Sequence, residues 1–147
     1  MPPAFLVTLH LSMFYVLVTA GTICTFWGLG LLIARWRAGK ATSAGQERAS
    51  EQQTPGRLPI SPIYRSAIRI TGLLALIQAI LGGILYLLHG KPADNLHYVY
   101  GLLVLLAIPA ASVYLTGKPE KAQRDLIVLI VAALILAAAA VRAFMTG

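Results

Sequence analysis

Long apolar runs alternate with short polar segments along this 147-residue chain. Four such runs begin near Phe5, Tyr64, Leu96 and Leu126. Each continues for about twenty residues or more, the length an α-helix needs to cross the roughly 30 Å hydrocarbon core of a bilayer. The pattern therefore predicts an all-α integral membrane protein, a single transmembrane domain over residues 1–147 built as a four-helix bundle.

The ends of the runs set the expected helix bounds at about 4–34, 62–89, 95–116 and 121–145. Between the first two helices, residues 35–61 are rich in Ala, Ser, Gln and Gly, and they are expected to form a flexible cytoplasmic loop. Ser61 followed by Pro62 is typical of a helix start. Pro109 lies inside the third run and is expected to kink that helix.

The composition excludes an ordinary soluble domain. Hydrophobic residues make up 58% of the chain and charged residues only 12%, with a mean hydropathy of +0.76. These residues cannot supply the polar shell that a soluble domain of this size requires.

The net charge of +7 is distributed unevenly along the chain. Ten of the twelve basic residues lie between, or just inside, the first and second helices or the third and fourth. The segment between the second and third helices holds only Lys91, and the C-terminal end only Arg142. By the positive-inside rule this asymmetry predicts that both termini lie on the outer side. It favours contact with lipid headgroups and argues against nucleic acid as a partner.

Three histidines, His10, His89 and His97, are expected at one membrane level, near the outer surface. Imidazole is a common axial ligand of haem b, and it can also take a proton from a quinol. Near His97, the residues Asp94 and Tyr100 would share its helix face, so that Asp94 could orient the ring. These five residues are the candidate cofactor-binding set. No metal-binding motif accompanies them.

A structural explanation of the same residues stays open. Histidine tolerates the interface at a helix end, and tyrosines at this level are typical of an aromatic belt. The lone cysteine, Cys24, is interpreted as a small buried apolar residue.

The expected membrane interior is almost free of polar groups. Gln78 is the strongly polar side chain near the middle of the second helix, and no charged residue is expected at mid-depth. Proton pumps and ion-coupled transporters use intramembrane ionisable residues, so these classes are disfavoured. Ala75, Ala79 and Gly83 form a ladder of small residues with a spacing of four, which allows another helix to approach closely.

Together these features favour a non-catalytic integral membrane subunit of a larger, energy-transducing complex, either respiratory or photosynthetic. Its expected partners are membrane lipids and other transmembrane subunits, and its expected location is the bacterial inner membrane. The alternative is a small cytochrome b-like or quinol-site protein that uses the outer histidines to hold haem b or a quinone.

Overall fold

The structure is a computed structural model that describes residues 4–45, 60–89 and 94–146. It contains α1 (Ala4–Gly45), α2 (Pro62–His89), α3 (Leu96–Tyr114), the short 3₁₀ helix η2 (Pro119–Lys121) and α4 (Ala122–Thr146). The four long helices are each long and apolar enough to cross a membrane. The predicted all-α bundle of four transmembrane helices is therefore confirmed.

The first helix is longer than its apolar run. It was expected to end near Ala34, but α1 continues to Gly45, so the first part of the expected loop is helical. Arg, Ala and Lys in this stretch are good helix formers. Lys40 also places its Nζ 3.8 Å from the centroid of the Trp36 ring, one turn earlier. The rest of the expected loop, residues 46–59, lies outside the described residues.

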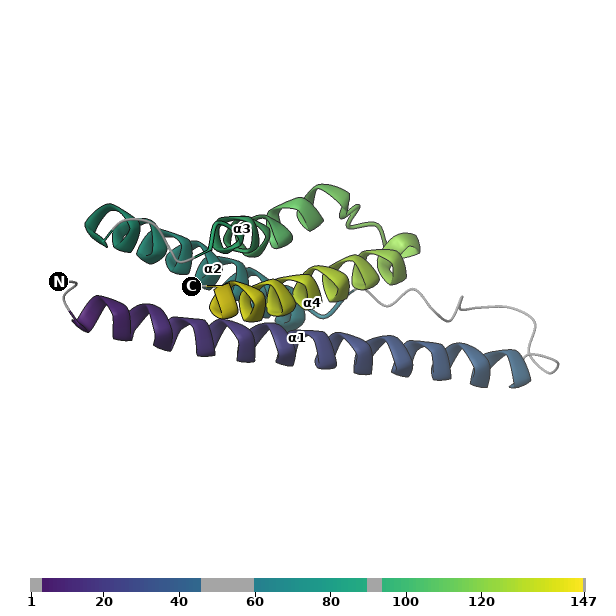
Figure 1. The fold of residues 1–147 in the computed structure, drawn as a ribbon. Helices are drawn as coiled ribbons and strands as arrows, with labels where there is room; N and C mark the ends of the chain where they lie inside the picture. Colours follow the sequence, from purple (N-terminus) through teal and green to yellow (C-terminus); the bar gives the residue numbers. More distant parts are fainter. Residues whose placement is uncertain (1–3, 46–59, 90–93, 147) are drawn as a thin grey trace.

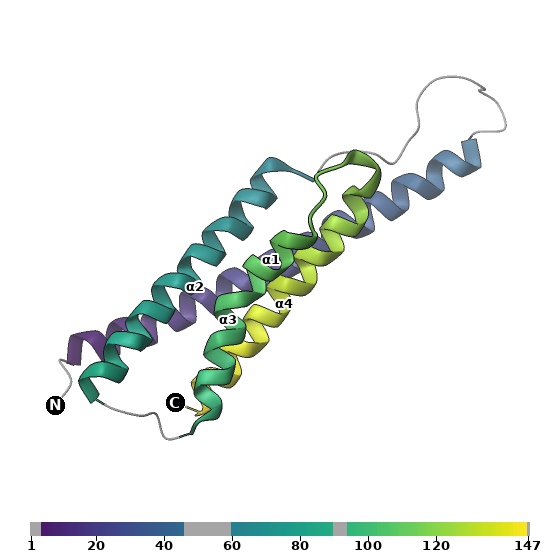
Figure 2. The same cartoon turned by 90° about the horizontal axis from the view of Figure 1, so that it is seen from above.

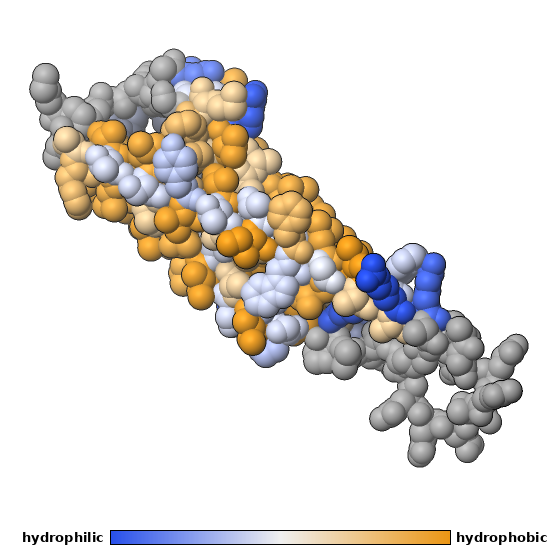
Figure 3. Space-filling view, turned by 90° about the horizontal axis from the view of Figure 1, so that it is seen from below, coloured by the Kyte–Doolittle hydropathy of each residue, from blue (hydrophilic) through white to orange (hydrophobic). Residues whose placement is uncertain are grey.

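The helices form a ring in which each contacts the next and α4 closes against α1. Successive helices run in opposite directions (Figures 1 and 2). The starts of α1 and α3 and the ends of α2 and α4 share one end of the bundle, called here the termini end. The α3–α4 connection lies at the other end, called here the turn end. Apolar side chains cover the middle of the face shown in Figure 3, and the most hydrophilic described side chains lie toward its two ends.

Helix α4 is the centre of the packing. Half of its most apolar segment is buried inside the described bundle, against 11% for the corresponding segment of α2. One set of its buried apolar positions follows a three-and-four spacing, the pattern of helices that pack side by side with a small crossing angle. They are Leu126, Leu129, Ala133, Leu136 and Ala140.

Glycine allows close helix contact at one point where three helices meet. A Cβ atom on Gly28 of α1 would collide with the Tyr64 hydroxyl of α2 and would lie 2.5 Å from Cγ1 of Ile130 of α4. Tyr64 itself is completely buried. The absence of a side chain at Gly28 thus allows a large aromatic residue to fill the core at the first turn of α2.

The connection between α3 and α4 is fixed by a buried carboxylate. Oδ2 of Asp125 accepts hydrogen bonds from the backbone N–H groups of Thr116 at 3.0 Å and Gly117 at 2.9 Å. The Thr116 hydroxyl lies 3.2 Å from both carboxylate oxygens. Gly117 has a φ of +67°, which glycine adopts without steric strain. Asp125 therefore links the end of α3 to the first turn of α4.

Pro109 lies inside α3 as the sequence indicates, and α3 is bent in both views of the bundle (Figures 1 and 2). Proline removes one backbone hydrogen bond from a helix, which accounts for a bend at this position.

Candidate functional site

A polar contact between helices joins α1 and α2 toward the termini end. The side-chain nitrogen of Gln78 donates to the backbone oxygen of His10 at 3.1 Å. The same nitrogen lies 3.3 Å from Nε2 of the His10 ring. Gly82, one turn after Gln78, leaves room for this ring, because a Cβ atom there would lie 3.4 Å from His10 Cε1. Gln78 of α2 therefore hydrogen-bonds a neighbouring helix, α1.

These contacts determine how the two side chains share their protons. The Gln78 amide must present its NH₂ group to the His10 carbonyl, because its oxygen would repel that carbonyl. Nε2 of His10 is then the acceptor, so a neutral ring carries its proton on Nδ1. Nδ1 of His10 and Oε1 of Gln78 are both buried and have no hydrogen-bond partner among the described residues. One donor on His10 and one acceptor on Gln78 are thus left unsatisfied.

The second histidine of the site joins α3 to α4. Nδ1 of His97 lies 2.8 Å from the backbone oxygen of Ala143. A carbonyl only accepts, so Nδ1 carries the proton and Nε2 of the neutral ring carries the lone pair. An imidazole that donates from one nitrogen to a backbone carbonyl has its other nitrogen oriented for a ligand or a proton.

Aromatic contacts surround this level of the bundle. Phe14 of α1 stacks on Phe144 of α4 with ring centroids 4.5 Å apart. Tyr86 of α2 meets Tyr98 of α3 edge to face at 5.9 Å. All four helices therefore contribute to the site, which we call the histidine level: His10, Gln78, His97 and the aromatic residues around them.

The structure describes the side chains of two of the remaining candidate residues, Asp94 and Tyr100. Oδ1 of Asp94 accepts from the backbone N–H of Leu96 at 2.9 Å, while Nδ1 of His97 lies against the Ala143 carbonyl. Tyr100 lies under the guanidinium of Arg142, whose Cζ is 5.7 Å from the ring centroid. His89 is the last residue of α2, and its side chain lies outside what the structure describes.

The small-residue ladder of α2 divides between two environments. Ala75 is buried in the bundle. Ala79 is half-buried, and Gly83 is exposed. Apart from its chain neighbours and the backbone of α2, no atom of the described residues would lie within 4 Å of a Cβ atom on Gly83. The outer part of the ladder therefore faces away from the bundle's own helices.

Several contributors to the histidine level were not found from the sequence. Phe14 lies one turn after His10, and a search along that helix face would have found it. Arg142 was interpreted only as a marker of topology. The Ala143 carbonyl carries no sequence signal at all. Within the described residues, no group of three or more His, Cys, Asp or Glu side chains is placed to hold a metal ion.

The fold and its four apolar helices define the chain as an integral membrane protein of the four-helix transmembrane class. Comparisons with protein families, with curated proteins and with solved structures give no match.

Proposed function

We propose that this chain is a non-catalytic membrane subunit of a larger, energy-transducing complex, and that the outer face of α2 contacts a partner transmembrane helix. One observation carries the proposal. The least buried of the four apolar helices presents Gly83, with open space beside it, on its exposed face.

Small residues on a membrane helix allow the backbone of another helix to approach closely. Association in lipid depends on van der Waals contact, because lipid tails are as apolar as the side chains. Gly83 is flanked along the helix by exposed Ile80 and Leu87, so that it lies in a shallow notch between two larger side chains. A lipid-facing helix has no need of such a notch, whereas a partner helix can pack into it.

The test is co-purification of the tagged chain from its native membranes in mild detergent, with partner proteins identified by mass spectrometry. Partners are expected in stoichiometric amounts with the wild type and are expected to be lost in Gly83→Leu. Gly30→Leu is a matched control, because Gly30 also has open space around it but lies on α1. A wild-type chain that purifies alone, or partners that survive Gly83→Leu, would overturn the proposal.

The second candidate function is a haem- or quinol-binding protein, and the histidine level favours it. Because Nδ1 of His97 donates to the Ala143 carbonyl, Nε2 is the atom of this ring that is available to a haem iron. The unsatisfied Nδ1 of His10 and Oε1 of Gln78 match the acceptor and donor of a quinol headgroup. A haem would supply one-electron transfer at this level, and a quinone would supply coupled electron and proton transfer.

This candidate predicts a reduced-minus-oxidised absorption band in protein from native membranes, lost in His97→Ala and kept in His89→Ala. For a quinone the expected result is a co-extracted quinone that is lost in Gln78→Leu. If the wild-type protein shows no such band and contains no quinone, both cofactors are excluded.

The proposed orientation places both termini on the outer side of a bacterial inner membrane. Cys24, the sole cysteine, is buried within α1, so the wild type should not react with a membrane-impermeant maleimide. In intact spheroplasts, Met145→Cys at the termini end should react and Glu120→Cys at the turn end should not. The reverse labelling pattern would refute this orientation.

A further inference from the structure

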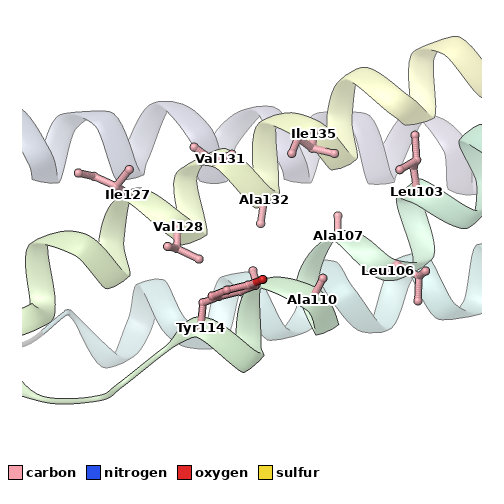
Figure 4. Close-up of a pocket in the computed structure, with 11 residues that line it drawn as sticks. Leu103, Leu106, Ala107, Ala110, Tyr114, Ile127, Val128, Val131, Ala132 and Ile135 are labelled. Carbon is pink, nitrogen blue, oxygen red and sulfur yellow. The ribbon is translucent and has the colours of Figure 1, made fainter.

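An apolar groove opens between α3 and α4 on the side of the bundle, with a volume of about 390 Å³. Its walls are one face of α3 from Leu103 to Tyr114 and one face of α4 from Ile127 to Ile135 (Figure 4). The groove exists because its walls combine small residues, among them Ala107, Ala110 and Ala132, with the bend at Pro109. Its volume lies within the range of sites that hold small organic molecules.

The length of the groove matches one leaflet of a bilayer. At a rise of about 1.5 Å per residue, the stretch from Leu103 to Tyr114 is about 16 Å long. Half of the roughly 30 Å hydrocarbon core is about 15 Å. The groove therefore extends from one membrane surface, at the turn end, to near the middle of the bilayer.

Positive charge lies at the turn-end mouth of the groove. Arg124 shares a face of α4 with Ile127, Val128 and Val131, and its guanidinium donates to the backbone oxygen of Tyr114 at 2.5 Å. Arg124 is half exposed. It also lies 3.3 Å from Oδ1 of Asp125, whose carboxylate is engaged by the α3–α4 connection.

Two further cations lie in the same connection. Lys118 and Lys121 flank Glu120 in the η2 turn, and both lysines are exposed. The balance of these charges at the mouth is positive, and cations at this level of a membrane attract anionic headgroups.

From this arrangement we propose that the groove holds an acyl chain of one anionic phospholipid, whose phosphate is bound by Arg124 together with Lys118 and Lys121. The length of the groove selects a single chain in one leaflet. The cations at its mouth select the headgroup, because a zwitterionic lipid carries a cation that these residues repel.

The test is native mass spectrometry of the full chain released from nanodiscs that contain phosphatidylcholine and phosphatidylglycerol in equal amounts. The wild type is expected to retain one phosphatidylglycerol molecule, at least threefold in preference to phosphatidylcholine. Ala110→Trp fills the groove and should abolish this retention. Val113→Trp is the matched control, because Val113 is 83% exposed on the same helix and does not line the groove.

The headgroup contact is tested by the double variant Lys118→Gln/Lys121→Gln, which leaves the groove unaltered. Its preference for phosphatidylglycerol should fall toward one. Helicity and a monodisperse elution profile establish that each variant is folded. If Ala110→Trp does not fold, the lipid preference of the lysine variant tests the proposal. Equal retention of the two lipids by the wild type, or an unchanged preference in the lysine variant, would overturn the proposal.

Discussion

Replacing Asp125 by alanine is expected to destabilise the bundle more than any other single change at the turn end. The carboxylate accepts from two backbone N–H groups and from the Thr116 hydroxyl. Alanine removes all of these acceptors while leaving the donors in place. A buried donor without a partner costs about 1–3 kcal/mol.

The cost of each unpaired donor lies in the lower part of the range of about 1–3 kcal/mol, at about 1–1.5 kcal/mol. Thr116 and Gly117 are themselves exposed, so water can reach part of the turn. Two amides at about 1–1.5 kcal/mol each give a loss of about 2–3 kcal/mol in the free energy of unfolding. The ion pair with half-exposed Arg124 adds almost nothing, because solvent screens such pairs.

The assay is reversible unfolding in mixed micelles by titration with dodecyl sulfate, followed by far-ultraviolet circular dichroism. Asp125→Asn keeps one carbonyl oxygen for the two amides, so its loss should be smaller, about 1 kcal/mol. Glu120→Ala removes an exposed acidic residue from the same turn and should leave stability unchanged. If Asp125→Ala behaves like Glu120→Ala, the carboxylate does not hold the α3–α4 connection, and the argument fails.

Four further substitutions test the packing and the α3–α4 turn, each measured as the change in free energy of unfolding in the same assay. Gly28→Ala should cost about 1–3 kcal/mol by overpacking against Tyr64 and Ile130. Gly30→Ala, with open space around it, should be neutral or slightly stabilising, and equal effects at the two sites would contradict the close approach at Gly28. Gly117→Ala should cost about 1 kcal/mol, because its φ of +67° strains any other residue, and an unchanged stability would refute that strain. Tyr64→Phe should leave stability unchanged or raise it slightly, because the buried hydroxyl has no partner among the described residues; a loss above about 1 kcal/mol would reveal a hydrogen bond there.

The level at which the candidate site lies could be predicted by counting turns from the ends of the apolar runs. That count places His10 near the start of α1 and His97 near the start of α3, and these two helix starts share the termini end of the bundle. The contacts could not be predicted in the same way. The bond from His97 goes to the backbone of Ala143, and no side chain signals an available carbonyl.

The sequence by itself determined that the chain forms four membrane-spanning helices, and it set most of their bounds to within a few residues. The physical reason is that lipid cannot hydrogen-bond the backbone, so an apolar run of sufficient length has to become a helix. Only the tertiary structure decided how each helix is rotated about its own axis. In a helix that is apolar on every side, hydropathy does not distinguish Ala75, which is buried, from Gly83, which is exposed. Close packing against particular neighbours makes that choice.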